Sequence, residues 1–179
     1  MEVPMLRSLL TLFIIVVSGL VMTVAHPKQI SKIPESLQNM TNVRLPVPGR
    51  ISAGPPTAEQ LVAFAAAGGD IVINLQSFEE LQDIPEASWA AKANLDYFHI
   101  PIAGSNDLTR EAVAQFDQIV TANRDRQMLM HCGSGNRVGA MIALRAAWHQ
   151  GATAAEAIAL GEEYGLASLK PHVESLLKE

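Results

Sequence analysis

Hydrophobic and polar positions follow two alternating patterns beyond about residue 50. Short runs that are almost wholly apolar alternate with longer stretches whose apolar residues recur at three- and four-residue spacing. The first pattern predicts strands buried on both faces, and the second predicts helices with one buried face. The predicted strands are residues 50–53, 70–75, 95–102 and 127–131.

Helix boundaries are marked by capping residues. Thr57 with Gln60, and Thr153 with a glutamate three positions on, have the spacing of a capping box, in which side chain and backbone at a helix start satisfy each other. Thr109 can cap a further helix, and Gly151 can end the helix that follows residues 127–131. Shorter helices are expected over residues 85–94 and 169–177.

Strands that alternate with helices predict an α/β fold with a mainly parallel central sheet flanked by helices. In such sheets, ligands bind beyond the carboxyl ends of the strands. The turn that follows residues 127–131 lies at such an end, so we expect the functional site there.

The N-terminal segment has a different pattern. Residues 8–27 contain no Lys, Arg, Asp or Glu, and Arg7 supplies a positive flank. This is typical of a secretory signal peptide and of a single membrane anchor, and both predict export to the periplasm, either free or tethered to the inner membrane. We expect a signal peptide or anchor over residues 1–25, a tether over 26–42 and one domain over 43–179.

Composition narrows the choice of partners. The formal net charge of −5 provides no basic surface, which argues against a nucleic-acid partner. No dinucleotide-binding or nucleotide-binding glycine motif occurs, and the histidines lack metal-ligand spacing, so neither a cofactor nor a metal is expected. The acidic cluster Glu79, Glu80 and Asp83 is interpreted as a solvated loop, and His99 as a strand residue with a local hydrogen bond.

The single cysteine lies in the turn identified above, within "HCGSGNR". Glycines let the backbone approach a ligand closely, and a turn between strand and helix can point its N–H groups at an anion. The following helix start and Arg137 add positive charge, and the same donors stabilise a thiolate at Cys132. A buried structural thiol is the alternative. The expected anion-binding residues are Gly133, Ser134, Gly135, Asn136 and Arg137.

This loop resembles two families. The order of His, Cys, Gly and Arg resembles the phosphate loop of cysteine-dependent tyrosine and dual-specificity phosphatases, whose usual spacer between Cys and Arg is five residues. The spacer here has four residues, as in the rhodanese sulfurtransferase loop. The Asp-Val-Arg element that rhodaneses usually carry upstream is missing, since the corresponding strand ends "INLQSFEE".

Segments "RISAGPPTAEQLVAFAAAGGDIVINL", "LDYFHIPIAGSNDLT" and "HCGSGNRVGA" together resemble the beta-lactamase hydrolase-like (DUF442) family of phosphatase-like proteins over about residues 43–177. The resemblance implies a phosphatase fold in which Cys132 is the nucleophile and Arg137 grips the phosphoryl group. It also implies that Asp107 is the general acid, although a helix-capping role is an equal alternative. His131 would support the loop. Val138 stands where related phosphatases carry a hydroxyl.

The leading hypothesis is therefore a cysteine-dependent phosphatase that acts on a phosphorylated protein or a small phosphate ester. A sulfurtransferase that takes sulfur from a sulfane-sulfur donor onto Cys132 is the second hypothesis, and a catalytically weak anion-binding module is the third. Asp107 distinguishes the first two, because sulfur transfer needs no general acid.

Overall fold

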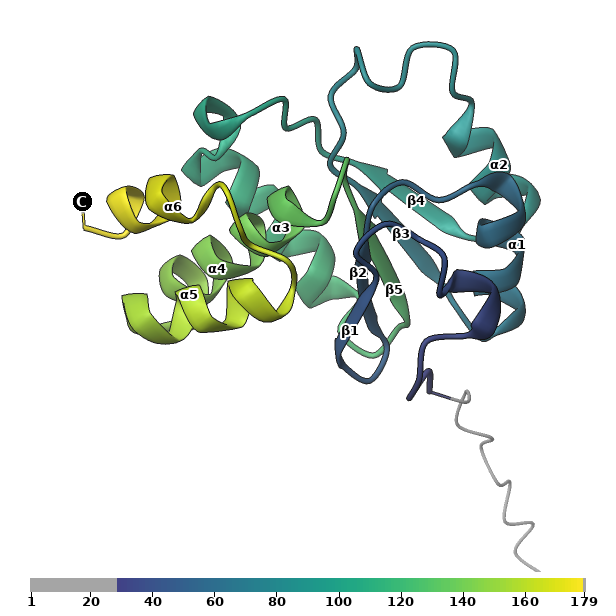
Figure 1. The fold of residues 1–179 in the computed structure, drawn as a ribbon, viewed down its shortest axis with the longest axis horizontal. Coiled ribbons are helices and arrows are strands. Elements are labelled where there is room, and N and C mark those ends of the chain that lie inside the picture. The colour runs from purple at the N-terminus through teal and green to yellow at the C-terminus, as the bar shows by residue number, and fades with distance from the viewer. Residues whose placement is uncertain (1–28, 179) are drawn as a thin grey trace, which may run out of the picture.

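The computed structural model describes residues 29–178 and consists of one five-stranded sheet between two layers of helices (Figure 1). The strand order is β1-β2-β5-β3-β4. β2 is antiparallel to β1, and the remaining neighbours are parallel. The mainly parallel α/β fold predicted from the sequence is confirmed. The strands are β1 (Arg44–Val47), β2 (Arg50–Ala53), β3 (Ile71–Asn74), β4 (Asp96–His99) and β5 (Met128–His131).

The central strand, β5, carries the functional turn. Its four residues are all buried, and both of its neighbours run parallel to it. At its carboxyl end, His131 is in register with Ala53 of β2 and Asn74 of β3. The carboxyl ends of β2, β5 and β3 therefore lie side by side at one edge of the sheet, and the loops that follow them start next to one another.

Each face of the sheet buries its own hydrophobic cluster. One face is covered by a short 3₁₀ helix, η1, with α1 and α2, and its cluster includes Leu37, Phe64, Val72 and Leu129. The other face is covered by α3 to α6, and its cluster includes Cys132. The helices are η1 (Glu35–Leu37), α1 (Ala58–Ala66), α2 (Glu86–Lys92), η2 (Ser105–Asp107), α3 (Arg110–Ala122), α4 (Asn136–Gln150), α5 (Ala154–Glu163) and α6 (Lys170–Leu176).

The capping signals read from the sequence are confirmed. Thr57 and Thr153 form complete capping boxes at the starts of α1 and α5, and the Thr109 side chain accepts a hydrogen bond at the start of α3. Gly151 ends α4 with φ of 73°, a left-handed conformation that glycine adopts without strain.

The stretch interpreted as a tether is, in its described part, packed on the domain. Leu37 is fully buried, and Ile30 and Met40 are 5 % exposed. The Ile30 carbonyl accepts a hydrogen bond from Gly49 N, and the Thr41 carbonyl accepts one from Gly54 N. Ile30, Ile33, Leu37 and Met40 recur at three- and four-residue spacing, so the sequence did contain a signal of burial. The polar residues and proline between them led to the interpretation as a tether. β1 was also missed.

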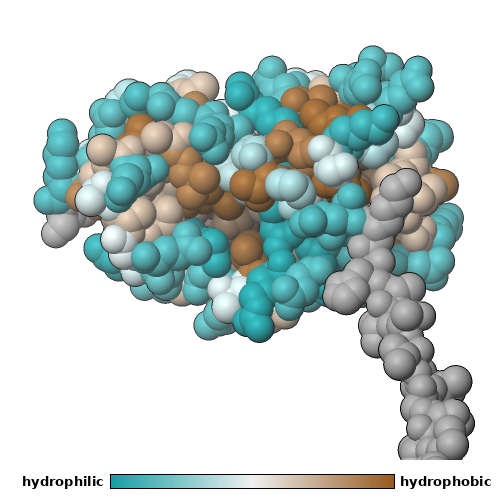
Figure 2. Space-filling model, turned by 90° about the horizontal axis from the view of Figure 1, so that it is seen from below, coloured by the Kyte–Doolittle hydropathy of each residue, from teal (hydrophilic) through white to brown (hydrophobic). Residues whose placement is uncertain are grey.

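The predicted signal peptide or anchor over residues 1–25 lies outside the described residues. Between residues 29 and 178, none of the helices combines the length and the apolar character needed to cross a bilayer. Figure 2 shows the side of the domain seen from below, where hydrophobic residues form a band across the middle and hydrophilic residues surround it.

Candidate active site

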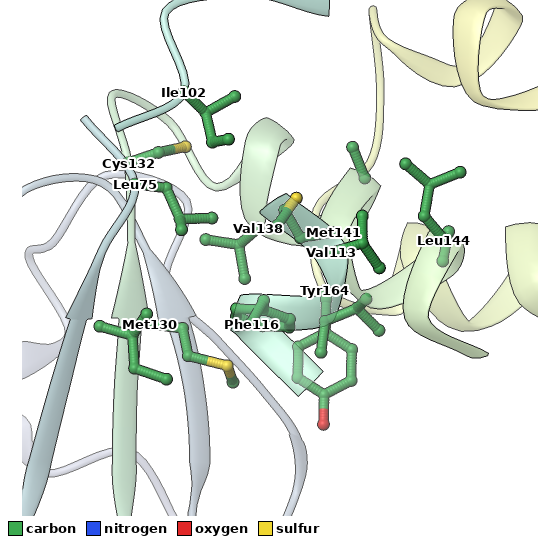
Figure 3. Packing of buried hydrophobic residues seen from close by; sticks show 14 of the residues in the cluster. Leu75, Ile102, Val113, Phe116, Met130, Cys132, Val138, Met141, Leu144 and Tyr164 are labelled. Atoms are coloured by element: carbon green, nitrogen blue, oxygen red, sulfur yellow. The ribbon is translucent and has the colours of Figure 1, made fainter. Parts of the chain in front are cut away.

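Cys132 follows directly after β5 and lies at the edge of the larger hydrophobic cluster. Figure 3 shows it beside Leu75 and below Ile102, two residues from the segments that follow β3 and β4. Its side chain is 1 % exposed, and its backbone N–H points to the carbonyl of Ala53 at 3.4 Å. The thiol is thus held at the end of the central strand, with polar loops on one side and the core on the other.

The turn after Cys132 directs a backbone donor at the sulfur. Gly135 N lies 3.2 Å from Cys132 Sγ and donates to it. Gly135 has φ of 84° and is the residue before α4, so the chain reverses in a left-handed conformation that favours glycine. The sulfur therefore lies beside a backbone donor at the start of a 15-residue helix, the end of a helix that attracts anions.

Arg137 reaches from the first turn of α4 across the ends of β3 and β4. Its Nη1 donates to the Ile102 carbonyl at 2.5 Å and lies 3.4 Å from the Leu75 carbonyl. Both Nη atoms donate to Glu80, each at 2.6 Å. The guanidinium is therefore fixed by the two segments that follow β3 and β4, and its orientation does not depend on a ligand.

Glu80 is a site residue that the sequence interpretation assigned to a solvated loop, and that assignment is wrong. Its carboxylate forms a two-pronged ion pair with Arg137, the geometry in which a carboxylate binds a guanidinium most strongly. Hydrogen bonding from Arg137 lowers the pKa of Glu80 to about 2, and the same bonds raise the pKa of Arg137 above its usual value. Glu80 also accepts a hydrogen bond from Ser77 N, which fixes the loop after β3.

A buried polar network supports the cysteine loop from inside the sheet. His131 Nε2 donates to Glu86 Oε1 at 2.7 Å, and both side chains are almost completely buried. The other carboxylate oxygen of Glu86 accepts from Asn74 Nδ2 at 3.1 Å, and the same amide donates to the Tyr97 hydroxyl at 2.9 Å. Burial, reinforced by the charge of Glu86, raises the pKa of Tyr97 to about 12.

This network gives His131 its predicted supporting position and adds two members that the pattern did not reveal. Asn74 and Glu86 lie at the end of β3 and the start of α2, and both connect to the residue just before the nucleophile. Buried polar side chains require such partners, because an unpaired one costs about 1–3 kcal/mol. The predicted parallel sheet placed the ends of these strands at one edge, but only the strand order shows that Asn74 ends the strand next to β5.

Asp107, the predicted general acid, lies in η2 on the loop between β4 and α3. Its Oδ2 accepts from Ala103 N at 2.7 Å and from Gly104 N at 3.3 Å, so it caps this short turn, whereas Thr109 caps α3. The same loop contains Ile102, whose carbonyl accepts a hydrogen bond from Arg137. The capping role is therefore observed, and the acid role stays a prediction.

The remaining loop residues divide between the anion site and its surroundings. The Asn136 side chain turns away to the connection between α5 and α6, donating to Ser168 Oγ and accepting from Ala167 N. The Ser134 carbonyl accepts from Asn42 Nδ2 at 3.2 Å. Val138 is fully buried and carries no hydroxyl. The Asn136 side chain is thus engaged elsewhere, and the backbone N–H groups of Gly133, Ser134 and Asn136 stay the predicted anion donors.

Histidine positions complete the picture of the site. His99 Nε2 lies 2.8 Å from the Gln76 carbonyl, which confirms the local hydrogen bond expected for it, and its ring contacts Phe78 edge-on at 5.0 Å. Within the described range, no group of three or more His, Cys, Asp or Glu side chains is arranged to hold a metal ion.

Similar folds occur in solved phosphatase structures. A protein from Shewanella putrefaciens CN-32 named "Putative phosphatase (DUF442)" matches with 24% identity and a TM-score of 0.64, over 80% of this chain and 95% of its own. The active form of Tk-PTP matches with 18% identity and a TM-score of 0.57, over 76% and 96%. Pseudomonas aeruginosa TpbA, in complex with pTyr, matches with 15% identity and a TM-score of 0.53, over 86% and 90%. These likenesses establish the tyrosine and dual-specificity phosphatase fold.

Sequence comparison identifies the family. No curated protein matches the chain. Residues 40–162 match the sequence model described as "Swiss Army Knife protein, DSP-PTPase phosphatase domain", a range that includes the cysteine loop and every residue of the buried network. The chain therefore belongs to the Swiss Army Knife family of DSP-PTPase phosphatase domains.

Proposed function

We propose that the protein is a cysteine-dependent phosphatase that hydrolyses phosphate monoesters through a phosphocysteine intermediate. The observation that carries the proposal is the placement of Cys132 in the turn between β5 and α4. There Gly135 N donates to its sulfur, and Arg137 is fixed at the same edge of the sheet. The complex of TpbA with pTyr supports a phosphate monoester as the substrate class.

The first step would be attack of the Cys132 thiolate on phosphorus. The S–P bond forms as the P–O bond to the leaving group breaks, and backbone N–H groups with Arg137 stabilise the charge on the phosphoryl oxygens. Asp107 would protonate the leaving oxygen. Because its Oδ2 accepts two backbone N–H groups, Oδ1 is the oxygen available to carry that proton.

The second step would be hydrolysis of the phosphocysteine. Water attacks phosphorus, the P–S bond breaks, and the Asp107 carboxylate accepts a proton from the water. Val138 cannot donate a hydrogen bond to the departing thiolate, so the Gly135 N–H is the donor that the structure provides. Slow turnover of the intermediate is therefore expected.

Steady-state hydrolysis of an aryl phosphate tests this proposal. Cys132→Ser is expected to reduce the rate to background, since an alcohol is not ionised at neutral pH. Arg137→Lys is expected to lower kcat/KM about a hundredfold, because an ammonium cannot form the two-pronged contact with phosphate or Glu80. Activity that survives Cys132→Ser would contradict the proposed nucleophile.

A sulfurtransferase is the second candidate, favoured by the capping role of Asp107. In that reaction the Cys132 thiolate attacks the outer sulfur of a donor such as thiosulfate, the S–S bond of the donor breaks, and sulfite leaves with its electron pair. No proton donor is required. Asp107→Asn should then leave sulfur transfer intact, whereas it should impair phosphate hydrolysis.

The compartment is also a proposal. The uncharged leader of residues 8–27 supports export to the periplasm, with or without a retained tether to the inner membrane. Fractionation of cells that produce the full chain, followed by detection of the protein in the periplasmic, membrane and cytoplasmic fractions, tests both forms. Recovery in the cytoplasmic fraction would overturn the proposal.

A further inference from the structure

A second polar pocket adjoins the cysteine loop. It has a volume of about 300 Å³ and lies between the start of β1, the cysteine loop and the connection from α5 to α6. Ser134 and Asn136 of the loop form one wall, Asn42 and Arg44 another, and Gly165 and Ser168 a third. The volume is at the lower end of the range for small-molecule sites, so the pocket suits one small group rather than a large ligand.

Hydrogen bonds tie the other two walls to the cysteine loop. Asn42 Nδ2 donates to the Ser134 carbonyl at 3.2 Å, and Asn136 Nδ2 donates to Ser168 Oγ at 2.7 Å. Asn136 Oδ1 also accepts from Ala167 N at 2.8 Å. The pocket is thus built on the same turn that holds the nucleophile. Ser134 and Asn136 of that turn would separate a group bound in the pocket from the anion site.

Close backbone packing at Gly165 brings one wall of this pocket against the cysteine loop. Gly165 has φ of 107°, and a Cβ there would lie 3.2 Å from the Gly135 carbonyl oxygen and 3.6 Å from Arg44 Nε. The Arg44 side chain therefore passes over Gly165, and the absence of a Cβ lets the connection from α5 to α6 approach Gly135. Glycine is required here on both conformational and steric grounds.

The charge of the pocket is positive and uncompensated. Within residues 29–178, the Arg44 side chain makes no hydrogen bond and no ion pair, in contrast with Arg50, Arg126, Arg137 and Arg145. The other residues that line the pocket are neutral. Hydroxyls of Ser134 and Ser168 and the Asn42 amide surround it, and a guanidinium with hydroxyl and amide donors is the combination that binds phosphate.

We propose that this pocket binds a second phosphate of the substrate, so that the enzyme acts on small bisphosphates in preference to monophosphates. The proposal rests on the proposed function, because it takes the cysteine loop as the site of the phosphate that is removed. The second phosphate would be held by Arg44 while the first lies over Cys132, with Ser134 and Asn136 separating the two.

Calorimetric binding to Cys132→Ser tests the pocket without relying on turnover. The probes are fructose 6-phosphate and fructose 1,6-bisphosphate, which share one carrier. The bisphosphate is expected to bind about tenfold more tightly, and Cys132→Ser combined with Arg44→Ala should bring this ratio close to one. Arg44 is exposed and unbonded, so its truncation should leave the melting temperature unchanged. Arg124→Ala, which removes an exposed arginine at the opposite ends of the strands, is the matched control and should keep the ratio.

The outcomes separate the two proposals. The second phosphate site would be overturned if Arg44→Ala left the ratio of the two affinities unchanged. It would also be overturned if the protein that retains Arg44 bound both sugars equally. Either result leaves the proposed function standing. If fructose 6-phosphate fails to bind while the bisphosphate binds in an Arg44-dependent manner, the pocket is supported and the cysteine loop loses its role as phosphate site. If Arg124→Ala lowered the ratio of the two affinities as much as Arg44→Ala does, the preference would reflect general charge attraction, and the second phosphate site would be overturned.

Discussion

Arg137 and Glu80 change the expected electrostatics of the anion site. A free arginine beside the thiol would offer a full positive charge to a phosphoryl group, whereas here a carboxylate is bound to it at 2.6 Å. Glu80 also approaches the loop itself, since a Cβ on Gly133 would lie 3.3 Å from Glu80 Oε1. Glu80 therefore fixes the orientation of Arg137 and also neutralises part of its positive charge. Phosphate binding consequently relies more heavily on backbone N–H groups.

Replacement of Glu80 by Gln should reduce stability in a pH-dependent way. The folded-state pKa of Glu80 is about 2, against an ordinary value of 4.5, so the ion pair contributes stability above about pH 4.5 and loses it as the pH falls toward 2. The Glu80 side chain is 34% exposed, so solvent screening limits the contribution to about 1 kcal/mol. Urea denaturation of both proteins at pH 6 and pH 3 measures the difference, which should shrink at the lower pH.

Glu79→Gln is the matched control for this experiment. Glu79 is the exposed neighbour of Glu80, and its carboxylate makes no contact with Arg137. Its replacement should change the free energy of unfolding by less than about 0.5 kcal/mol at either pH. A Glu80→Gln effect that stays the same at pH 6 and pH 3 would show that the ion pair does not contribute as described.

Two substitutions of Asp107 distinguish a role as general acid from a role as helix cap. Asparagine keeps an oxygen that can accept from Ala103 N and Gly104 N, so Asp107→Asn should preserve the turn and lose only the proton. We expect it to lower kcat for an aryl phosphate about a hundredfold or more, with little change in melting temperature. Asp107→Ala should lose activity and also destabilise the fold by about 1 kcal/mol. Full activity of the asparagine variant would assign Asp107 to capping alone.

At the scale of elements, the buried network joins β3, β5, β4 and α2 beneath the cysteine loop. Glu86 accepts on both oxygens, from His131 and from Asn74. Glu86→Gln can keep both contacts only if its amide donates to His131 Nε2, which moves the imidazole proton to Nδ1, a buried atom with no hydrogen-bond partner among the described residues. We expect a loss of about 2 kcal/mol in unfolding free energy and a shifted pH profile of activity. The pH profile of activity is the decisive measurement, because a loss of stability alone would not shift it.

Helices α4 and α5 pack so closely that glycine is required between them. A Cβ on Gly139 would lie 2.5 Å from the Gly161 carbonyl oxygen and closer still to Leu166 N. Alanine is the better helix former by about 1 kcal/mol, but backbone atoms cannot move aside as a side chain can. Gly139→Ala should therefore destabilise the protein by about 3 kcal/mol, visible as a clear drop in melting temperature. Gly104→Ala, where no atom lies within 4 Å of the new Cβ, should be neutral.

At the scale of the molecule, the fold was predictable because its signals are local. Each buried strand reads as an apolar run, and α1, α3 and α5 each begin after a threonine whose capping hydrogen bond the structure contains. The cysteine loop was predictable for the same reason, since its thiol, glycines and arginine are consecutive. β1 was not, because its proline and its half-exposed residues hide the alternation expected of a strand.

Residues that act through long-range contacts could not be found in this way. Glu80 lies 57 positions from Arg137, and Glu86 lies 45 positions from His131. Glu79 and Glu80 are adjacent and chemically alike, and only the path of the loop after β3 decides which of them faces the arginine. Sequence pattern places such loops at the correct edge of the sheet, but it does not choose the residue.

The central claim is that Cys132 becomes covalently phosphorylated, and intact-mass analysis after rapid quenching tests it most directly. The full-length protein is mixed separately with an aryl phosphate and with thiosulfate, alongside Cys132→Ser. We expect a phosphoryl adduct on Cys132 from the aryl phosphate, which persists because the second step is slow, and no adduct on the serine variant. A sulfur adduct from thiosulfate without any phosphoryl adduct would contradict the phosphatase and identify a sulfurtransferase.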